Sequence, residues 1–320
     1  MFRKVLSFIK KNRLIVPGQR ILVALSGGAD SVALFHILHK AARKYNFKLI
    51  AAHLNHCIRG KEADEDEKWV KWFCRKLKHR CITGRINVPV FAEKRKLSIE
   101  TAGREIRYKF LSEVARKVDA DVIATAHHAD DQAETVLMRF LRGAGTKGLS
   151  GIQPAILYDG FPVVRPLLET DKQEVLRYLK RNNLIWREDS TNAEASYLRN
   201  KIRHKLIPYL EKNFNSQIKR IIFETSFSIK EDYDLISKIV QDAYRENKKL
   251  SVKEINELHP ALQKRIILQA IIEKKKSLKD IESSHIKEIL KLLRSTKSKT
   301  KSISFKGLKI IIKGDKLLIS

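Results

Sequence analysis

Cysteine is scarce in this chain of 320 residues, which contains three, at Cys57, Cys74 and Cys81. An odd number of cysteines without a Cys-x-x-Cys pair argues against a disulfide framework, a zinc ribbon and a cysteine-bound iron–sulfur cluster. The pattern favours a reducing compartment, and we expect the protein to be cytoplasmic.

Long apolar runs are also absent, because none approaches the roughly 18 residues that a membrane-spanning helix needs. The N-terminal segment places apolar side chains at helical spacing but interrupts them with Lys10 and Lys11. We therefore predict an amphipathic first helix rather than a signal peptide, with a transit peptide as the alternative. No membrane partner and no stable protein partner are expected.

Acidic residues are in the minority, with 36 Asp+Glu against 65 Lys+Arg and a net charge of +29. The basic excess extends over both parts of the chain. The repulsion between so many positive charges destabilises the folded chain, and their electric field mainly attracts polyanions. Nucleic acid is therefore the expected partner. The 43% of hydrophobic residues is sufficient for a folded core.

Short apolar runs alternate with amphipathic stretches up to about residue 215. The runs at 21–25, 49–54 and 121–126 are too short for helices, so we predict buried parallel strands there and a weaker strand near 81–86. Helical patterns cover 31–44, 62–79, 98–117 and 130–142. This order predicts an α/β fold with a doubly wound, mostly parallel sheet.

The pattern changes after residue 166. We predict a helix over 170–182, opened by a Thr170/Gln173 capping box, and a basic helix over 197–210. Residues 211–216 are a predicted linker between a domain of residues 1–215 and a basic domain of residues 216–320. Helices to about residue 293 and β runs at 303–305, 308–313 and 316–319 predict that the second, smaller domain is α+β.

The first predicted strand runs directly into the sequence SGGADS and then into a helix. Gly27 and Gly28 permit a tight turn that exposes backbone amides, and Ser26 and Ser31 add hydroxyl groups. The positive end of the helix, near Asp30, points to the same place, which predicts an anion-binding loop. No lysine closes the loop as in a Walker A motif, and a turn that needs small residues for steric reasons is the alternative.

This strand, loop and helix resemble the PP-loop of the N-type ATP pyrophosphatase superfamily, whose members cleave ATP to AMP and pyrophosphate. The resemblance implies that ATP is bound, with Mg²⁺ near Asp30. It assigns the phosphates to the loop and the adenine to the end of the next strand, which together give the expected ATP-binding residues Ser26, Gly27, Gly28, Ala29, Asp30, Ser31, Ala52 and His53.

A second polar cluster, HHADD, follows the predicted strand at 121–126. It places His127, His128, Asp130 and Asp131 beside the crevice in which open α/β sheets bind ligands. Glu134 follows Asp131 by one helical turn and shares its face. The cluster could bind a metal or receive an ammonium group; helix capping and a packed histidine are the alternatives.

Basic side chains also recur on two predicted helices. Arg104 and Arg107 lie three residues apart, where a solvated, ion-paired face is the alternative to a substrate contact. In the helix over 197–210 an apolar stripe leaves the basic face free, which predicts phosphate contacts by Arg199, Arg203 and Lys205. A merely solvated face is again the alternative.

Six further segments resemble one family of this superfamily, the tRNA(Ile)-lysidine synthetases. They occur in one order over about two thirds of the chain, and Gly103 departs from the Ala expected in its motif. The segments are HLNHCIRGKEADEDE (53–67), ETAGREIRYKFL (100–111), ATAHHADDQAETVLMRFLRGAG (124–145), VRPLL (164–168), WREDSTN (186–192) and RNKIRHKLIPYL (199–210).

The resemblance implies ligation of L-lysine to the wobble cytidine of a tRNA(Ile) with a CAU anticodon. ATP adenylates the cytosine carbonyl oxygen, and the lysine ε-amine then displaces AMP to give lysidine. Asp130 or Asp131 holds the ammonium, and His127 or His128 accepts the proton because histidine titrates near neutral pH. The expected catalytic residues are Asp30, His127, His128, Asp130, Asp131, Arg104 and Arg107, and the expected substrate contacts are Asp131, Glu134, Arg199, Arg203 and Lys205.

Three other functions remain open at the level of sequence. One is another PP-loop enzyme that acts on tRNA, such as a cytidine thiolase; those that use iron–sulfur chemistry need clustered cysteines. Another is a basic RNA-binding protein whose loop has lost catalysis. A small-molecule amidating ligase explains SGGADS but gives no reason for a charge of +29. The second domain is expected to help distinguish tRNA(Ile) from the methionine tRNA with the same anticodon.

Overall fold

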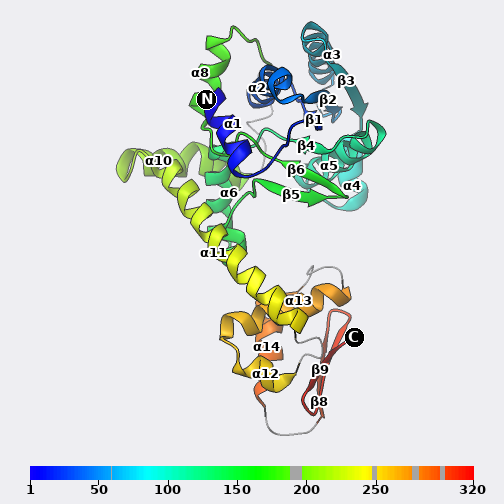
Figure 1. Ribbon diagram of the computed structural model, residues 1–320, viewed down its shortest axis with the longest axis vertical. Coiled ribbons are helices and arrows are strands. Elements are labelled where there is room, and N and C mark those ends of the chain that lie inside the picture. The colour runs from blue at the N-terminus through cyan, green and yellow to red at the C-terminus, as the bar shows by residue number, and fades with distance from the viewer. Residues whose placement is uncertain (59, 188–196, 247–250, 276–280, 296–299) are drawn as a thin grey trace. The chain divides into compact units, whose positions relative to one another are not determined.

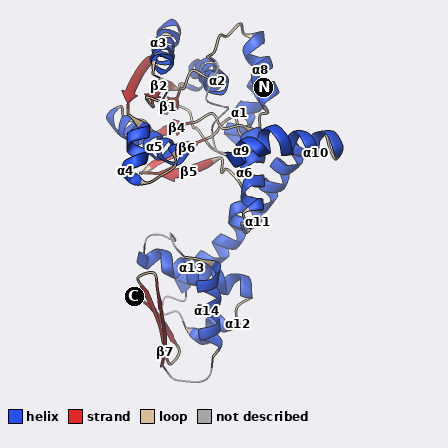
Figure 2. Ribbon diagram, turned by 180° about the vertical axis from the view of Figure 1, so that it is seen from behind, coloured by secondary structure: helices blue, strands red, loops and turns tan. Residues whose placement is uncertain are grey.

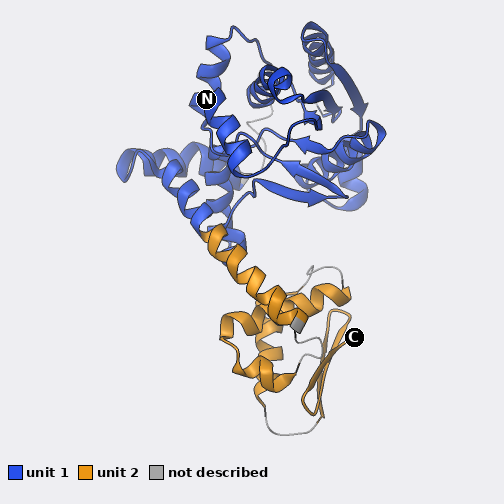
Figure 3. Ribbon diagram, in the orientation of Figure 1, with its two compact units in different colours: residues 1–228 blue, residues 229–320 orange. Residues whose placement is uncertain are grey.

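The computed structural model describes residues 1–58, 60–187, 197–246, 251–275, 281–295 and 300–320. The chain forms two compact units, Met1–Ser228 and Ile229–Ser320 (Figure 3). Their boundary falls inside helix α11 (Ile218–Glu246), later in the chain than the predicted domain boundary at residue 215. Phe223 and Phe227 of α11 pack in the core of unit 1, whereas Val240 packs in that of unit 2.

A six-stranded sheet of order β3-β2-β1-β4-β6-β5 forms the centre of unit 1 (Figures 1 and 2). Its first five strands in this order pair in parallel, and β5 pairs antiparallel with β6 at one edge. This confirms the predicted mostly parallel sheet. The strands are β1 (Arg20–Ala24), β2 (Lys48–Asn55), β3 (Arg80–Arg85), β4 (Val122–Ala124), β5 (Ala155–Tyr158) and β6 (Phe161–Val164).

Both faces of this sheet are covered, which explains why its strands are continuous apolar runs. Alternate residues of β1 enter different cores: Ile21 and Val23 pack on one side and Leu22 on the other. Helix α5 (Ile99–Lys117) covers the second side, and α4 (Val88–Arg95) packs against α5. The first side is covered by α1 (Phe2–Lys11), α2 (Ala29–Tyr45), α3 (Lys61–Lys76) and α8 (Lys172–Arg181).

The start of α8 corrects the predicted capping box. The N-cap is Asp171, whose carboxylate accepts a hydrogen bond from the amide of Glu174 at 2.6 Å. The Asp171 amide donates to Glu174 Oε2 at 3.1 Å. Thr170, the predicted N-cap, is instead buried with 1% of its surface exposed. The pattern is ambiguous because both Thr170 and Asp171 are followed by an amide or carboxylate side chain three residues later.

Helices α6 (Ala129–Leu141) and α7 (Thr146–Leu149) follow β4. The helix predicted over 197–210 consists of three consecutive segments: α9 (Tyr197–Lys201), the π-helical segment η2 (Ile202–Leu206) and α10 (Ile207–Asn213). Ile202 and Ile207 pack against Ala133 of α6 in a small core of their own. Residues 188–192 of the WREDSTN motif lie outside the described residues.

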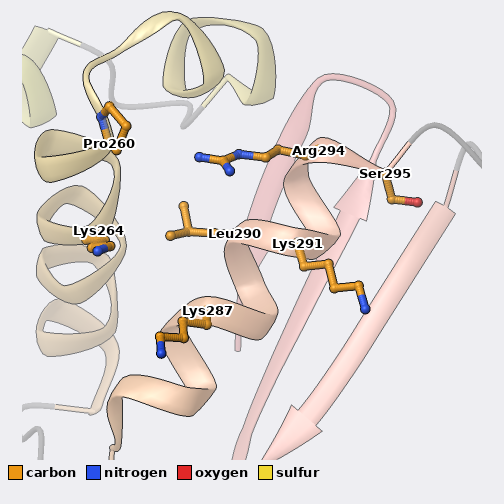
Figure 4. Close-up of a pocket in the computed structure, with 7 residues that line it drawn as sticks. All are labelled: Pro260, Lys264, Lys287, Leu290, Lys291, Arg294 and Ser295. Atoms are coloured by element: carbon orange, nitrogen blue, oxygen red, sulfur yellow. The ribbon is translucent and has the colours of Figure 1, made fainter.

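Unit 2 is α+β, as predicted. A three-stranded antiparallel sheet, β7-β8-β9, packs its apolar side chains against the helices in one core. Its elements are α12 (Val252–Glu257), α13 (Pro260–Lys275), α14 (Ser283–Arg294), β7 (Thr300–Phe305), β8 (Leu308–Lys313) and β9 (Lys316–Ile319). A pocket of about 720 Å³, which Lys264, Lys287 and Arg294 help to line, lies between α13 and α14 (Figure 4).

In the described part of the chain, no helix has the length and apolar character required to cross a membrane.

Candidate active site at the carboxyl ends of β1 and β4

The predicted polar loops meet at the point where the strand order reverses. Strand β1 lies between β2 and β4, and the chain leaves β1 toward β2 before it returns to form β4. The loop of residues 25–28 follows β1, and residues 125–128 follow β4. Because β1 and β4 are parallel, both loops lie at the same edge, where open α/β sheets bind ligands.

The first of these loops is a compact turn held by its two serines. Ser31 Oγ lies 3.1 Å from Ser26 Oγ and donates to the carbonyl of Gly28 at 2.9 Å. The amide of Ser26 donates to Ser31 Oγ at 3.2 Å. Helix α2 then begins at Ala29 with Gly28 as its N-cap and without a hydrogen bond from a capping side chain. Its N-terminal amides are therefore available to an anion.

A distant segment holds the same loop from outside. The Gly27 carbonyl accepts a hydrogen bond from the Arg187 amide at 3.0 Å, and Gly27 has a φ of +95°, which favours glycine. The Arg187 guanidinium binds Asp66 at 2.8 Å and Glu65 at 3.0 Å, both on α3. These contacts fix the backbone of the turn relative to α3.

Asp30, in the first turn of α2, forms an ion pair that was not predicted from the sequence. Lys172 Nζ lies 2.7 Å and 2.8 Å from its two carboxylate oxygens. Burial acts to raise the pKa of Asp30, but His128 and Lys172 outweigh it and lower this pKa to about 2. Lys172 is the first residue of α8, so a lysine from far along the chain reaches the loop that has none of its own.

His128 caps α6 and is surrounded by carboxylates. Its amide donates to Asp131 Oδ2 at 3.0 Å, and its Nε2 lies 3.6 Å from oxygens of Asp30 and Asp131. Nδ1 lies 3.7 Å from Asp130. Burial opposes a positive charge here, but the three carboxylates overcome it and raise the pKa of His128 to about 9. A hydrogen bond from the Asp131 amide to Nδ1 would favour the neutral ring, but at 3.4 Å this contact is too long to offset the effect of the three carboxylates on the pKa. His128 is an imidazolium at neutral pH.

His127 has the opposite environment. Its Nδ1 lies 3.1 Å from Thr125 Oγ1, and the ring is half-buried. Burial and the positive charges of Arg165 and Arg104 lower the pKa of His127 well below its usual value. His127 is therefore neutral where His128 is charged, and the expectation that one of the two accepts a proton stays a prediction.

The two aspartates of α6, Asp130 and Asp131, differ in their hydrogen bonds and ion pairs. Asp130 accepts from the Lys172 amide at 2.9 Å and binds Lys219 Nζ at 3.0 Å. Lys219 also binds Glu211 at 3.2 Å. Asp131 Oδ2 is used in the cap, and among the described residues its Oδ1 has a single long contact of 3.9 Å, to Arg203. Among the described residues, Asp131 is thus the less closely paired carboxylate, although the two side chains are nearly equally exposed, at 16% for Asp130 and 18% for Asp131.

Glu134 is buried with 2% of its surface exposed. Arg203 Nε donates to one oxygen at 2.6 Å, and Arg199 Nε donates to the other at 2.9 Å. Arg199 and Arg203, expected to be free for phosphate, are therefore turned toward α6, whereas Lys205 is exposed. Contacts of Glu134 or of these two arginines with substrate stay predictions.

Arg165 of the VRPLL segment is buried, and it was not predicted either. Its Nη1 donates to the Gln153 carbonyl at 2.6 Å and its Nη2 to the Tyr108 hydroxyl at 3.2 Å. Its Nε is buried and has no hydrogen-bond partner in the part of the chain that the structure describes. Arg104 lies over the Tyr108 ring at 4.8 Å from the centroid. Arg107 is on the same helix, one turn after Arg104. These cations form the positive side of the site around His127.

The end of β2 supplies the remaining predicted residues. Ala52 and His53 are buried, with 2% and 5% of their surfaces exposed. His53 Nδ1 donates to the Leu25 carbonyl at 2.9 Å, which leaves Nε2 as a buried acceptor without a partner among the described residues. This unpaired nitrogen beside the loop fits an adenine amino group.

Comparison with known proteins assigns the chain to a family. Residues 1–210 match the model of the PP-loop domain, so the chain belongs to the PP-loop family. In a solved structure, the U34-tRNA thiolase NcsA from Methanococcus maripaludis, this fold recurs with a TM-score of 0.61 and 24% identity. The likeness covers 72% of this chain and 78% of that one.

Curated relatives are similar over a longer stretch. A tRNA(Ile)-lysidine synthase of Clostridium acetobutylicum is 41% identical over 93% of this chain. One of Clostridium perfringens is 42% identical over 91% of it, and one of Geobacter sulfurreducens is 38% identical over 92%. The chain spans 66%, 63% and 64% of the lengths of these three relatives.

Proposed function

We propose that the chain ligates L-lysine to the wobble cytidine of a tRNA(Ile) with a CAU anticodon, at the expense of ATP, which leaves as AMP and pyrophosphate. The similarity to relatives named tRNA(Ile)-lysidine synthase supports this reaction. The observation that carries it is the pairing of a phosphate loop with two adjacent histidines, of which His127 is neutral and His128 is positively charged. The three free thiols and the reaction itself support a cytoplasmic location.

In this proposal the loop after β1 binds the β and γ phosphates through the amides at the start of α2 and the hydroxyls of Ser26 and Ser31. Lys172 supplies the positive charge that the loop lacks, because its ammonium already lies against Asp30. The His53 Nε2 acceptor receives the adenine amino group at the end of β2.

Mg²⁺ fits the same edge. Asp30 provides an ionised, partly exposed carboxylate whose pKa is lowered to about 2. The described residues contain no group of three or more His, Cys, Asp or Glu that could hold a metal. Mg²⁺ at nucleotide sites commonly uses one or two carboxylates with substrate phosphates and water, so Asp30 would hold it. When bound, the ion would neutralise phosphate charge.

The first step forms a bond between the cytosine ring carbonyl oxygen and the α-phosphorus of ATP, and pyrophosphate leaves. In the second, the lysine ε-nitrogen bonds to the ring carbon, the carbon–oxygen bond breaks and AMP leaves. His127 accepts the amine proton, because it is the neutral histidine of the pair. Bound phosphates neutralise the arginines that lower its pKa, which brings this pKa toward the working pH.

Asp131 is the proposed ammonium site, because in the described part of the chain its Oδ1 has no cation closer than 3.9 Å. The neighbouring Asp130 supports this chemistry, since it already binds the alkylammonium of Lys219 at 3.0 Å. Arg104, Arg107 and Arg165 on the positive side are proposed to hold the phosphates of the RNA or of AMP.

Multiple-turnover pyrophosphate release by the full chain tests the proposal. We expect release only when ATP, L-lysine and tRNA(Ile) with the CAU anticodon are all present. The product tRNA should gain the mass of lysine minus water on its wobble cytidine. Sustained release without lysine, or sulfur in place of lysine in the product, would contradict the proposed reaction.

A further inference from the structure

A shallow apolar groove of about 410 Å³ lies on unit 1 where α9, η2 and α10 pass the end of α6. Part of its apolar lining comes from the stripe that the helical pattern predicted to be buried. Leu141 of α6 and Tyr209 of α10 line it with 57% and 58% of their surfaces exposed. The remaining apolar lining residues are Leu198, Ile202 and Leu206.

Aromatic surface continues beside this groove. Phe140, next to Leu141, is 65% exposed, and Phe214 is 72% exposed. The rings of Phe214 and Tyr209 have centroids 5.9 Å apart. An exposed apolar patch with polar residues around it is typical of an interaction site, because water contact with such a surface is unfavourable.

The charge at the groove favours a polyanion over an apolar protein segment. Its other two lining residues are Lys201 and Lys205, and no carboxylate is among them. Arg142, directly after Leu141, is exposed as well. An exposed aromatic ring on an apolar surface, flanked by cations, is an arrangement that binds unstacked nucleobases, since every base has a π-face and a phosphate on each side.

The helix that forms the groove also reaches the candidate active site. Arg199 and Arg203 bind Glu134 in the first half of α6, whereas the groove lies at Leu141, the last residue of that helix. The rise of an α-helix places Leu141 about 18 Å from Ala129. The π-helical turn of η2 adds a residue to the helix, and Lys205 and Leu206 both line the groove.

We propose that this groove binds an unstacked nucleobase of the RNA substrate, at a single-stranded position other than the modified cytidine. Tyr209 stacks on the base, and Lys201 and Lys205 contact the adjacent phosphates. The inference rests on the proposed function, from which RNA is taken as the substrate class. It adds a second RNA-binding point on the same unit, so that the strand is held at one position besides the reacting base.

Binding of the full chain to a fluorescent anticodon stem-loop tests the groove. Tyr209→Ala should raise the Kd by between about 5-fold and about 150-fold, the range measured for loss of one base–aromatic stack. Tyr209→Phe keeps the ring and should restore binding. Leu157→Ala is the matched control, because Leu157 is an exposed apolar residue of unit 1 outside the groove.

Abasic substitution at each loop nucleotide identifies the bound base. At that position the losses from the abasic site and from Tyr209→Ala should be clearly less than additive, whereas at other positions they should add. Lys205→Gln should lower the salt dependence of log Kd by about 0.7 if it contacts one phosphate of a single strand. With tRNA, Tyr209→Ala should raise KM and leave kcat at saturation unchanged.

The inference is overturned if folded Tyr209→Ala binds RNA as the wild type does, or if its effect adds with every abasic substitution. A change of oligomeric state in sedimentation, with Kd unchanged, would assign the groove to a protein partner instead. Pyrophosphate release by the wild type reports on the proposed function separately. RNA binding that depends on Tyr209 without lysine-dependent release would reject the proposed reaction and retain the groove.

Discussion

The edge of the sheet in unit 1 and the pocket between α13 and α14 in unit 2 both gather charged side chains, but with different balance. At the sheet edge, charges of both signs lie together: Lys172 lies 2.7 Å from Asp30, and His128 lies among three carboxylates. In the described part of unit 2, Lys264 and Lys287 line the pocket without an ion pair (Figure 4).

The charges at the sheet edge hold side chains in position, whereas those of the pocket attract anions. A balanced cluster fixes the orientation and protonation of each group, at the cost of removing charge from water. An unbalanced cluster fixes little but raises the local concentration of anions. Substitutions at the sheet edge should therefore change rates and stability steeply, and substitutions in the pocket should change mainly the response to salt.

The largest effect is expected at Lys172. Lys172→Ala removes the ammonium that serves the phosphate loop, so kcat/KM for ATP should fall by about 100- to 1000-fold, as for other groups that stabilise charge in a transition state. Steady-state pyrophosphate release measures this. Lys180→Ala, an exposed lysine on the same helix, should leave the value unchanged. An equal loss in both variants would show that Lys172 acts through the net charge of the helix and not through its position beside the phosphate loop.

The next effect is the pH dependence of stability that His128 provides. Its pKa is raised to about 9 in the folded chain, above the value of about 6.5 expected when unfolded. The stabilisation, about 3 kcal/mol, is complete below the unfolded pKa and is lost as pH rises through 9. Denaturant unfolding at pH 6 and pH 10 should show a drop in the wild type that His128→Gln lacks; parallel curves for the two would contradict the assignment.

A smaller effect is expected at Asp131, the proposed ammonium site. Asp131→Asn keeps an oxygen for the helix cap but loses the charge that holds an ammonium, so KM for L-lysine should rise by about 10-fold or more. Asp119→Asn, at a carboxylate with 90% side-chain exposure, is the control. An unchanged lysine KM in Asp131→Asn would move the ammonium site elsewhere.

The smallest effect is expected in unit 2. Lys264→Gln with Lys287→Gln should lower the salt dependence of log Kd for tRNA by about 0.7 to 0.9 for each phosphate that the two lysines neutralise, with a modest decrease in affinity. Lys309→Gln with Lys313→Gln, exposed lysines of β8, is the matched pair. If both pairs lower the slope equally, the pocket contributes only net charge.

The sequence predicted the parts of the fold that depend on local pattern. The buried strands at β1, β2 and β4 were found because both faces of the sheet are covered, which makes them continuous apolar runs. The β5–β6 hairpin was missed, since its short strands include Pro162 and exposed residues such as Leu157, which obscure the alternation. Helix α4 was missed for a similar reason, because Pro89 suggests a break although it occupies the first turn.

In the candidate site, too, the residues that form local sequence patterns were predicted, and those that only the fold brings together were not. The loop at residues 26–31 and the HHADD cluster were visible because strand, loop and helix follow each other directly in sequence. Lys172 and Asp30 are 142 residues apart in the chain, and no local pattern predicts such a pair. Arg165 was overlooked because a lone arginine carries no signal until burial leaves its Nε unpaired. The protonation states of His127 and His128 likewise depend on neighbours that only the fold supplies.

The bond from the Arg187 amide to the Gly27 carbonyl has a consequence for how a nucleotide is received. Because α3 anchors the Arg187 guanidinium, the turn holds its shape before any triphosphate arrives. Little conformational entropy then remains to be lost at that step, and binding free energy is kept for alignment of the α-phosphorus. The loop can therefore bind a nucleotide without first having to change its backbone conformation.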